Sequence, residues 1–297
     1  MNAIGGHQKL CKNLQSPTKF IGLHMQLIAT LQCQDQPGIV NAMTAGILEC
    51  SGNIIENQQF TDPITNLFVM RTKFDTENSI KTAQDKLSAK LSKFSPKVSI
   101  RESSHKKKVL ILVSKESHCL RDLFYLMQLD ELPIEIPLVI SNHNLLKDLV
   151  EANGAKFLKI ENNNEDVITK SITDFGIDFV VLARYMQILS ESLCEKMSGQ
   201  IINIHHSFLP GFKGAKPYHQ AYEKGVKIIG ATAHFVTKDL DEGPIIEQDT
   251  TTVNHATTPD ELISIGRDIE RRVLSKAVKL FAEDRIFQAK NRTIIFN

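Results

Sequence analysis

The stretch 109-VLILVS-114 decides the fold class, because it is an unbroken apolar run with the length of one strand. An unbroken run, unlike an alternating one, is typical of a strand that is buried on both faces of a parallel sheet. Strands and helices then alternate; the strands are predicted at 136–141, 156–160, 178–185 and 200–206, and the helices near 119–131, 144–153, 164–174 and 190–198. This alternation predicts an α/β fold with a doubly wound, mostly parallel sheet.

The chain after this region predicts an antiparallel edge and a closing helix. The segments 228-IIGATAHFVT-237 and 244-PIIEQDTTTV-253 have the composition of strands and only a short loop between them, so we expect them to pair antiparallel. An amphipathic segment at 258–284 predicts a long helix, which a short tail follows. Residues 109–297 are therefore predicted to form one domain.

Residues 25–103 predict a smaller domain of a different kind. The predicted order is strand 25–34, helix 39–50, strands 53–61 and 66–74, helix 79–94 and strand 97–103. This βαββαβ order is that of the ferredoxin-like fold. The polar segment 104-SHKKK-108 is the predicted linker. Residues 1–24 contain no acidic residue and predict a flexible extension; whether it is a targeting segment or reflects an upstream start stays open.

The composition is that of an ordinary globular protein, with 42% apolar and 23% charged residues. The formal net charge of +1 gives no overall attraction to nucleic acid or to a membrane surface, and no apolar run has the length of a membrane span. The five cysteines are an odd number without a CxxC pair, which argues against a disulfide framework and a structural zinc site. We therefore expect a cytoplasmic protein with no nucleic-acid or membrane partner.

Two adjacent histidines stand at the end of the predicted strand 200–206, in 202-INIHHSFLP-210. Because side chains alternate along a strand, Asn203 and His205 point to one face and His206 to the other. Ligands of an open parallel sheet bind beyond the carboxyl ends of its strands. The loop 237-TKDLDEGP-244, which carries Asp241, is expected to emerge from that same edge.

An amide, an imidazole and a carboxylate together fit the hydrolysis or transfer of a small acyl group. The amide donates to an oxyanion, the histidine moves a proton or polarises the carbonyl, and the carboxylate orients a water molecule and the histidine. Each of these residues, taken alone, is also compatible with a structural role. The turn 114-SKESHCLRDLF-124 contains no glycine, which argues against a nucleotide-phosphate cradle after the first strand of the sheet.

The string 203-NIHHSFLPGFKGAKPYHQAYEKGVKIIGATAHFV-236, together with 240-LDEGPIIEQ-248, resembles the formyltransferase family that uses 10-formyltetrahydrofolate. The resemblance covers about residues 109–297 and implies a catalytic triad of Asn203, His205 and Asp241. It implies further site residues, which are the substrate-binding Arg184, Tyr185, Met186, Gln187, Ile188, Leu189, His234 and Val236 and the supporting His206, Ser207 and Pro210. It also implies that folate is the substrate and that no metal or cofactor is required.

Some of these assignments have alternatives. In 184-RYMQIL-189 the apolar side chains fit a pterin wall or the protein core equally, and for Ile188 the core is the preferred interpretation. His206 stands where transferring members carry proline; it either holds the loop or helps to exclude an amine acceptor. A metal set of His205, His206 and Asp241 is disfavoured, because alternation points the two imidazoles apart.

Features outside the motif imply which reaction occurs. Members that formylate glycinamide ribonucleotide have a glycine-rich phosphate loop where this chain has SKESHC, and members that formylate methionyl-tRNA have a C-terminal domain where this chain has a helix and a short tail. The resemblance therefore implies hydrolysis of 10-formyltetrahydrofolate to formate and tetrahydrofolate, which supplies formate for purine synthesis and balances one-carbon folate pools. Transfer to an amine and a non-catalytic folate sensor remain as alternatives.

The N-terminal half has a resemblance of its own. The stretch 33-CQDQPGIVNAMTAGILECSGNIIENQQ-59 resembles the ACT domain, a small regulatory module. The resemblance implies side-by-side pairing, hence a homodimer or homotetramer, and an amino-acid effector such as glycine or methionine. Gly38 either makes the turn alone or lets the backbone approach a partner or ligand; both interpretations stay open.

Overall fold

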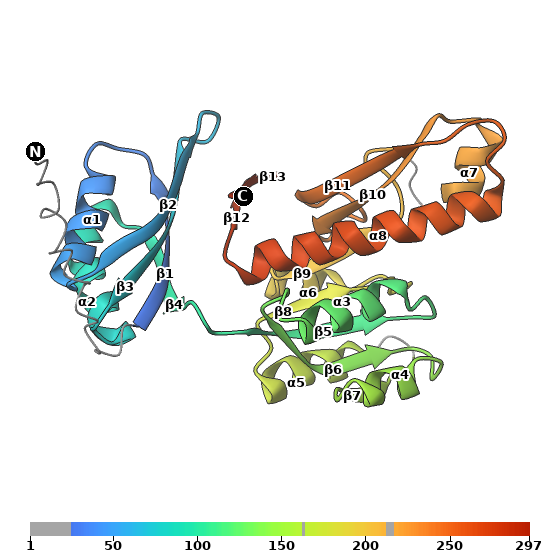
Figure 1. The fold of residues 1–297 in the computed structure, drawn as a ribbon, viewed down its shortest axis with the longest axis horizontal. Helices are drawn as coiled ribbons and strands as arrows, with labels where there is room; N and C mark the ends of the chain where they lie inside the picture. Colours follow the sequence, from blue (N-terminus) through green and yellow to red (C-terminus); the bar gives the residue numbers. More distant parts are fainter. Residues whose placement is uncertain (1–24, 162–163, 212–216) are drawn as a thin grey trace, which may run out of the picture.

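The computed structural model describes residues 25–161, 164–211 and 217–297 (Figure 1). The predicted extension 1–24 lies outside the described residues. Two separate sheets are present, a four-stranded one near the N-terminus and a seven-stranded one after it, and a two-stranded hairpin lies near the C-terminus. Among the described residues, no helix combines the length and the apolar character that crossing a bilayer requires.

The N-terminal unit has the predicted βαββαβ order. Its elements are β1 (Met25–Gln34), α1 (Ile39–Glu49), β2 (Asn53–Asp62), β3 (Leu67–Thr76), α2 (Ile80–Leu91), a 3-10 turn (Ser92–Phe94) and β4 (Lys97–Glu102). The strand order is β2-β3-β1-β4, and all neighbours are antiparallel. Alternate residues of β1, from Leu27 to Cys33, are buried against α1 and α2, because the period of two places them on one face.

The larger unit contains the seven-stranded sheet. Its elements are β5 (Lys107–Val113), α3 (His118–Gln128), β6 (Ile134–Ser141), α4 (Lys147–Ala152), β7 (Lys156–Lys159), α5 (Glu165–Phe175), β8 (Phe179–Leu182), α6 (Glu191–Lys196), β9 (Ile201–His205), α7 (Pro217–Glu223), β10 (Ile228–Phe235), β11 (Ile245–Thr252) and α8 (Pro259–Ala282). The strand order is β11-β10-β9-β8-β5-β6-β7. Neighbours from β9 to β7 are parallel, whereas β10 is antiparallel to both β9 and β11. The prediction of a mostly parallel sheet with an antiparallel edge is confirmed.

Helices cover both faces of this sheet (Figure 1). Residues of α3, α4, α7 and α8 share one apolar core with alternate strand residues, and residues of α5 and α6 share a second core with the others. Val109 to Val113 of β5 are all fully buried, as the unbroken apolar run predicts. The strand begins at Lys107, inside the predicted linker 104–108, because Lys107 and Lys108 already pair with Ile134 and Glu135 of β6. Lys107 Nζ also donates to the Phe281 carbonyl near the end of α8 (3.2 Å) and pairs with Asp284.

The C-terminal tail is not an irregular segment but a hairpin, β12 (Ile286–Ala289) with β13 (Arg292–Ile295). Phe287 and Phe296 pack with Val69 of β3 in a small core of their own. On the other side, Thr293 Oγ1 donates to the Ile245 carbonyl of β11 (2.6 Å). The sequence analysis predicted only a short tail after the long helix, so the hairpin escaped prediction although it touches both units.

Candidate active site

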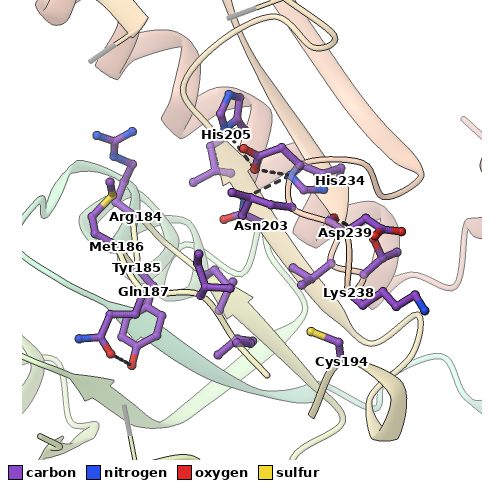
Figure 2. Close-up of a pocket in the computed structure, with 18 of the residues that line it drawn as sticks. Arg184, Tyr185, Met186, Gln187, Cys194, Asn203, His205, His234, Lys238 and Asp239 are labelled. Atoms are coloured by element: carbon purple, nitrogen blue, oxygen red, sulfur yellow. Dashed lines mark hydrogen bonds and ion pairs between the residues drawn. The ribbon is translucent and has the colours of Figure 1, made fainter. Parts of the chain in front are cut away.

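The catalytic candidates meet on the face of β9. Asn203 and His205 lie two residues apart on this strand (Figure 2), and Asp241 lies in the loop between β10 and β11. His205 Nδ1 is 3.3 Å from Asp241 Oδ1, and the His205 side chain is 5% exposed. All three residues line one cavity of about 230 Å³. The structure thus brings together the three residues that the family motif indicated.

The loop that carries Asp241 approaches the site from a direction other than the predicted one. The loop was expected to emerge from the carboxyl edge of the parallel strands, and this is wrong. Because β10 runs antiparallel to β9, its last residue Phe235 lies beside Ile202, and the loop begins at the amino end of β9. The loop then folds back along the strand, so that Asp241 faces His205.

His234 orients Asn203 through a chain of hydrogen bonds. Its Nδ1 lies 2.9 Å from the Phe235 carbonyl oxygen, which can only accept, so Nδ1 carries the proton. Nε2 is then an acceptor, and Asn203 Nδ2 donates to it at 3.1 Å. Burial, above all, lowers the pKa of His234 below its ordinary value, which keeps this ring neutral at neutral pH. One N–H of the Asn203 amide is therefore committed to positioning, and the other can serve a substrate oxygen.

The Asp241 carboxylate is charged. Burial alone raises its pKa, but the hydrogen bond from His205 and the electrostatic effect of that imidazole outweigh burial and lower the pKa below its ordinary value. The backbone of Asp241 has φ 57°, in the left-handed region that Asp and Asn tolerate best among residues with a side chain. Two residues later, a Cβ on Gly243 would lie only 1.7 Å from the Phe235 carbonyl oxygen, so glycine is required there.

The segment 184–189 forms the opposite wall of the cavity. Tyr185 and Leu189 are buried, and Tyr185 Oη donates to Gln187 Oε1 (3.2 Å; Figure 2). Met186 is 60% exposed and Ile188 68% exposed, although both line the cavity. The interpretation of Ile188 as a core residue is therefore wrong, because its side chain lies on the segment that follows β8 and is mostly exposed.

The remaining predicted residues fall into two groups. His234 and Val236 line the cavity together with the loop residues Thr237 to Leu240. Ser207 and Pro210 do not line it; they belong to the turn after β9, where Thr232 Oγ1 donates to the Ser207 carbonyl (2.9 Å) and accepts from Leu209 N–H (3.0 Å). The motif thus contains both cavity residues and residues that hold the turn.

His206 is buried next to the catalytic pair but has different neighbours. Its ring centroid is 5.3 Å from that of His205 and 6.2 Å from that of Tyr218 on α7. Burial lowers the pKa of His206 to about 3, with the positive charge of Arg184 as the second cause. The ring is therefore neutral at neutral pH.

The neutral state of His206 predicts a specific loss of stability in acid. Between pH 6.5 and pH 3 the unfolded chain binds a proton at His206 that the folded protein does not, so this contribution is fully present above pH 6.5 and is lost as the pH falls. We expect a loss on the order of 5 kcal/mol over this window. Urea unfolding at several pH values should show a shallower pH dependence in His206→Asn than in the parent protein. The exposed His255→Asn is the control, and equal slopes for parent and His206→Asn would contradict the prediction.

A buried polar cluster beside the cavity was missed by sequence reasoning. Glu270 of α8 is 1% exposed; it accepts from Tyr218 Oη at Oε1 and from His118 Nε2 at Oε2, both at 2.8 Å, and Arg184 Nε lies 3.5 Å from Oε2. The helical periodicity of the sequence could have revealed this cluster, since Glu270 lies among the apolar residues Ile269, Val273 and Leu274 of the long helix. An acidic residue on the buried face of a helix calls for polar partners elsewhere.

The same cluster contains a candidate metal set. Ligand atoms of His118, Cys119 and Glu270 lie within 4.8 Å of one another. Both carboxylate oxygens of Glu270 already accept hydrogen bonds, and the guanidinium of Arg184 places a positive charge beside them. Burial also raises the pKa of Cys119 well above its usual value, which disfavours the thiolate. The arrangement fits a hydrogen-bonded charge cluster better than a cation site.

Comparisons with known proteins identify the family of the chain. The family model described as Formyl transferase matches residues 107–278. The formyltetrahydrofolate deformylase of Bacillus subtilis is 46% identical over 90% of this chain and 92% of its own length, and that of Escherichia coli K12 is 41% identical over 92% and 99%.

Solved structures place the chain in the same family. A formyltetrahydrofolate deformylase of Burkholderia mallei superimposes with a TM-score of 0.88 at 39% identity, covering 92% of this chain and all of its own. A glycinamide ribonucleotide transformylase of Symbiobacterium toebii superimposes with a TM-score of 0.63 at 28% identity, covering 97% of its own chain but 66% of this one. The chain therefore belongs to the formyl transferase family and, within that family, to the formyltetrahydrofolate deformylases.

Proposed function

We propose that the protein hydrolyses 10-formyltetrahydrofolate to formate and tetrahydrofolate, with Asn203, His205 and Asp241 as the catalytic residues. The observation that carries the proposal is the pairing of His205 with a charged Asp241 beside an oriented Asn203, at the wall of one cavity. Relatives that match this chain over nearly its whole length carry the name of this activity.

The proposed steps follow from the geometry. The pterin lies in the cavity between the segment 184–189 and the loop 236–241, which places the N10 formyl group near β9. Asp241 and His205 orient a water molecule and take its proton as the water oxygen bonds to the formyl carbon. The free N–H of Asn203 donates to the resulting oxyanion. The bond from carbon to N10 then breaks, N10 receives the proton, and formate leaves.

The test uses the protein with 10-formyltetrahydrofolate alone. We expect formate and tetrahydrofolate to appear in equal amounts without any amine acceptor, and the rate to be unchanged after dialysis against EDTA. A requirement for an amine would show that the protein is a transferase, and binding without turnover would show that it is a folate sensor. A rate that EDTA abolishes and zinc restores would overturn the proposal that no metal or other cofactor takes part.

We also propose that residues 25–103 form an ACT domain that binds an amino-acid effector and pairs with a second copy of the chain. The βαββαβ arrangement supports this assignment, and the hairpin β12–β13 offers a physical connection. Arg292 Nη2 lies 2.6 Å from Asp62 Oδ1 in the N-terminal sheet, while Asn291 lines a groove with the loop residues Thr237 to Leu240. Glycine and methionine titrations should change the rate; no change in rate or binding would contradict the proposal.

The cellular role is proposed on the same basis. Formate released by this reaction would supply purine synthesis, and the tetrahydrofolate would balance the one-carbon pool. The described cysteines, Cys33, Cys50, Cys119 and Cys194, are all buried free thiols, which supports a reducing, cytoplasmic location.

A further inference from the structure

The buried charge cluster of His118, Arg184, Tyr218 and Glu270 lies at the topological switch point of the large sheet. From β5 the chain continues to β6 on one side, while β8 pairs with β5 on the other side. A switch point of this kind leaves a crevice beyond the carboxyl ends of the strands, and open α/β sheets bind ligands in that crevice. His118 begins α3 just after β5, and Arg184 follows β8 by two residues. Polar side chains that contact one another therefore occupy the crevice in which a second substrate would be expected to bind.

The cluster is continuous with the catalytic residues. Arg184 and His206 line the same cavity as Asn203 and His205. The His206 ring lies between those of His205 and Tyr218, at centroid distances of 5.3 and 6.2 Å. A nucleophile that approaches the formyl carbon from this side therefore meets the cluster.

We propose that this cluster determines the choice of nucleophile, by excluding amine acceptors and admitting water. The inference rests on the proposed hydrolase function and adds the residues that make the reaction hydrolytic. Both Glu270 oxygens already accept hydrogen bonds, so the carboxylate is a poorer acceptor for the N–H groups of an incoming amine. The amine attacks in its neutral form and its nitrogen becomes positively charged as the bond to carbon forms, which the positive charge of Arg184 opposes. Among the described residues, Arg184 Nε and Nη1 are buried without a hydrogen-bond partner, although Nε lies 3.5 Å from Glu270 Oε2, and the oxygen of a water molecule can accept from them.

The backbone is adapted to hold the cluster. Arg184 has φ 65°, a left-handed conformation that is costly for a long side chain and is characteristic of functional positions. Two hydrogen bonds with Ser114 fix this part of the backbone. Ser114 N–H donates to the Arg184 carbonyl (3.2 Å), and Ser114 Oγ accepts from Met186 N–H (3.0 Å). On α8, a Cβ at Gly266 would lie 2.1 Å from the Tyr218 ring, so glycine there lets the phenol reach Glu270 one helical turn later.

The experiment measures how the formyl group partitions between water and an amine. The protein is given 10-formyltetrahydrofolate with excess glycinamide near pH 8.5, and formate and N-formylglycinamide are quantified by mass spectrometry against an enzyme-free blank. Arg184→Gly removes the guanidinium and suits the left-handed backbone, so the fold should persist. Tyr218→Phe frees one Glu270 oxygen. Asp130→Gly, at φ 56° in an exposed turn away from the cavity, is the matched control.

We expect formate alone from the parent protein and from Asp130→Gly, and at least a tenfold higher ratio of N-formylglycinamide to formate from Arg184→Gly and Tyr218→Phe. The ratio does not depend on the fraction of folded protein, so a loss of stability cannot imitate the effect. Variants that hydrolyse with an unchanged ratio would overturn the inference and leave the hydrolase function intact. A parent protein that releases no formate would instead overturn the proposed function.

Discussion

The Asp241→Asn variant is expected to hydrolyse 10-formyltetrahydrofolate on the order of a thousandfold more slowly than the parent protein. The substitution removes the charge that faces His205 Nδ1 at 3.3 Å and so removes the proton acceptor of the site. It keeps the size of the side chain and suits the φ of 57° at this position, because asparagine tolerates the left-handed region as well as aspartate does. The loss should therefore reflect chemistry and not the path of the loop.

The measurement is the turnover number at saturating substrate, together with the dissociation constant of tetrahydrofolate. We expect the turnover number to fall while folate binding changes little, since the pterin wall is elsewhere in the cavity. The control is Asp249→Asn on β11, which also removes one negative charge but lies outside the cavity. Turnover within tenfold of the parent protein would remove Asp241 from the catalytic residues.

The Gly243→Ala variant is expected to lose at least a hundredfold in turnover although it adds only one methyl group. The new Cβ would lie 1.7 Å from the Phe235 carbonyl oxygen, so either the loop or this carbonyl must move. The same carbonyl accepts the Nδ1 hydrogen of His234, whose Nε2 in turn orients Asn203. A displacement of about 1 Å would thus disturb Asp241 and Asn203 together.

The matched control for this variant is Gly225→Ala. Gly225 has φ 61° and no heavy atom within 4 Å of an added Cβ, so alanine costs about 1 kcal/mol of stability through the backbone alone. We expect that variant to unfold at lower urea concentration but to keep its turnover number. Normal turnover in Gly243→Ala would mean that the loop adapts, and that its observed path is not needed for the reaction.

The sequence predicts much of the architecture, because the decisive signals are local. The unbroken run at 109–113 predicts a strand buried on both faces, and helical spacing predicts the long C-terminal helix to within a few residues. In the N-terminal unit, alternation along 25–34 predicts which side chains of β1 are buried. These patterns arise from the geometry of single elements, with periods of two or 3.6 residues, and they need no knowledge of neighbours.

The candidate site is predictable only in part. A period of two places Asn203 and His205 on one side of a strand, and the family motif adds Asp241. The direction from which the loop approaches was predicted wrongly, because it depends on β10 pairing antiparallel with β9. The exposure of Ile188 was also missed, since it depends on how the segment after β8 runs along the cavity.

The sequence by itself therefore determined the order of the elements that form the two large sheets and, through the motif, the identity of the catalytic candidates. Only the tertiary structure decided that His118 and Glu270, 152 positions apart, share a hydrogen bond, and that the tail at 286–295 contacts both units. The physical reason is that periodicity records which face of an element is buried, whereas a polar pair or a short hairpin is stabilised by partners that are distant in the chain.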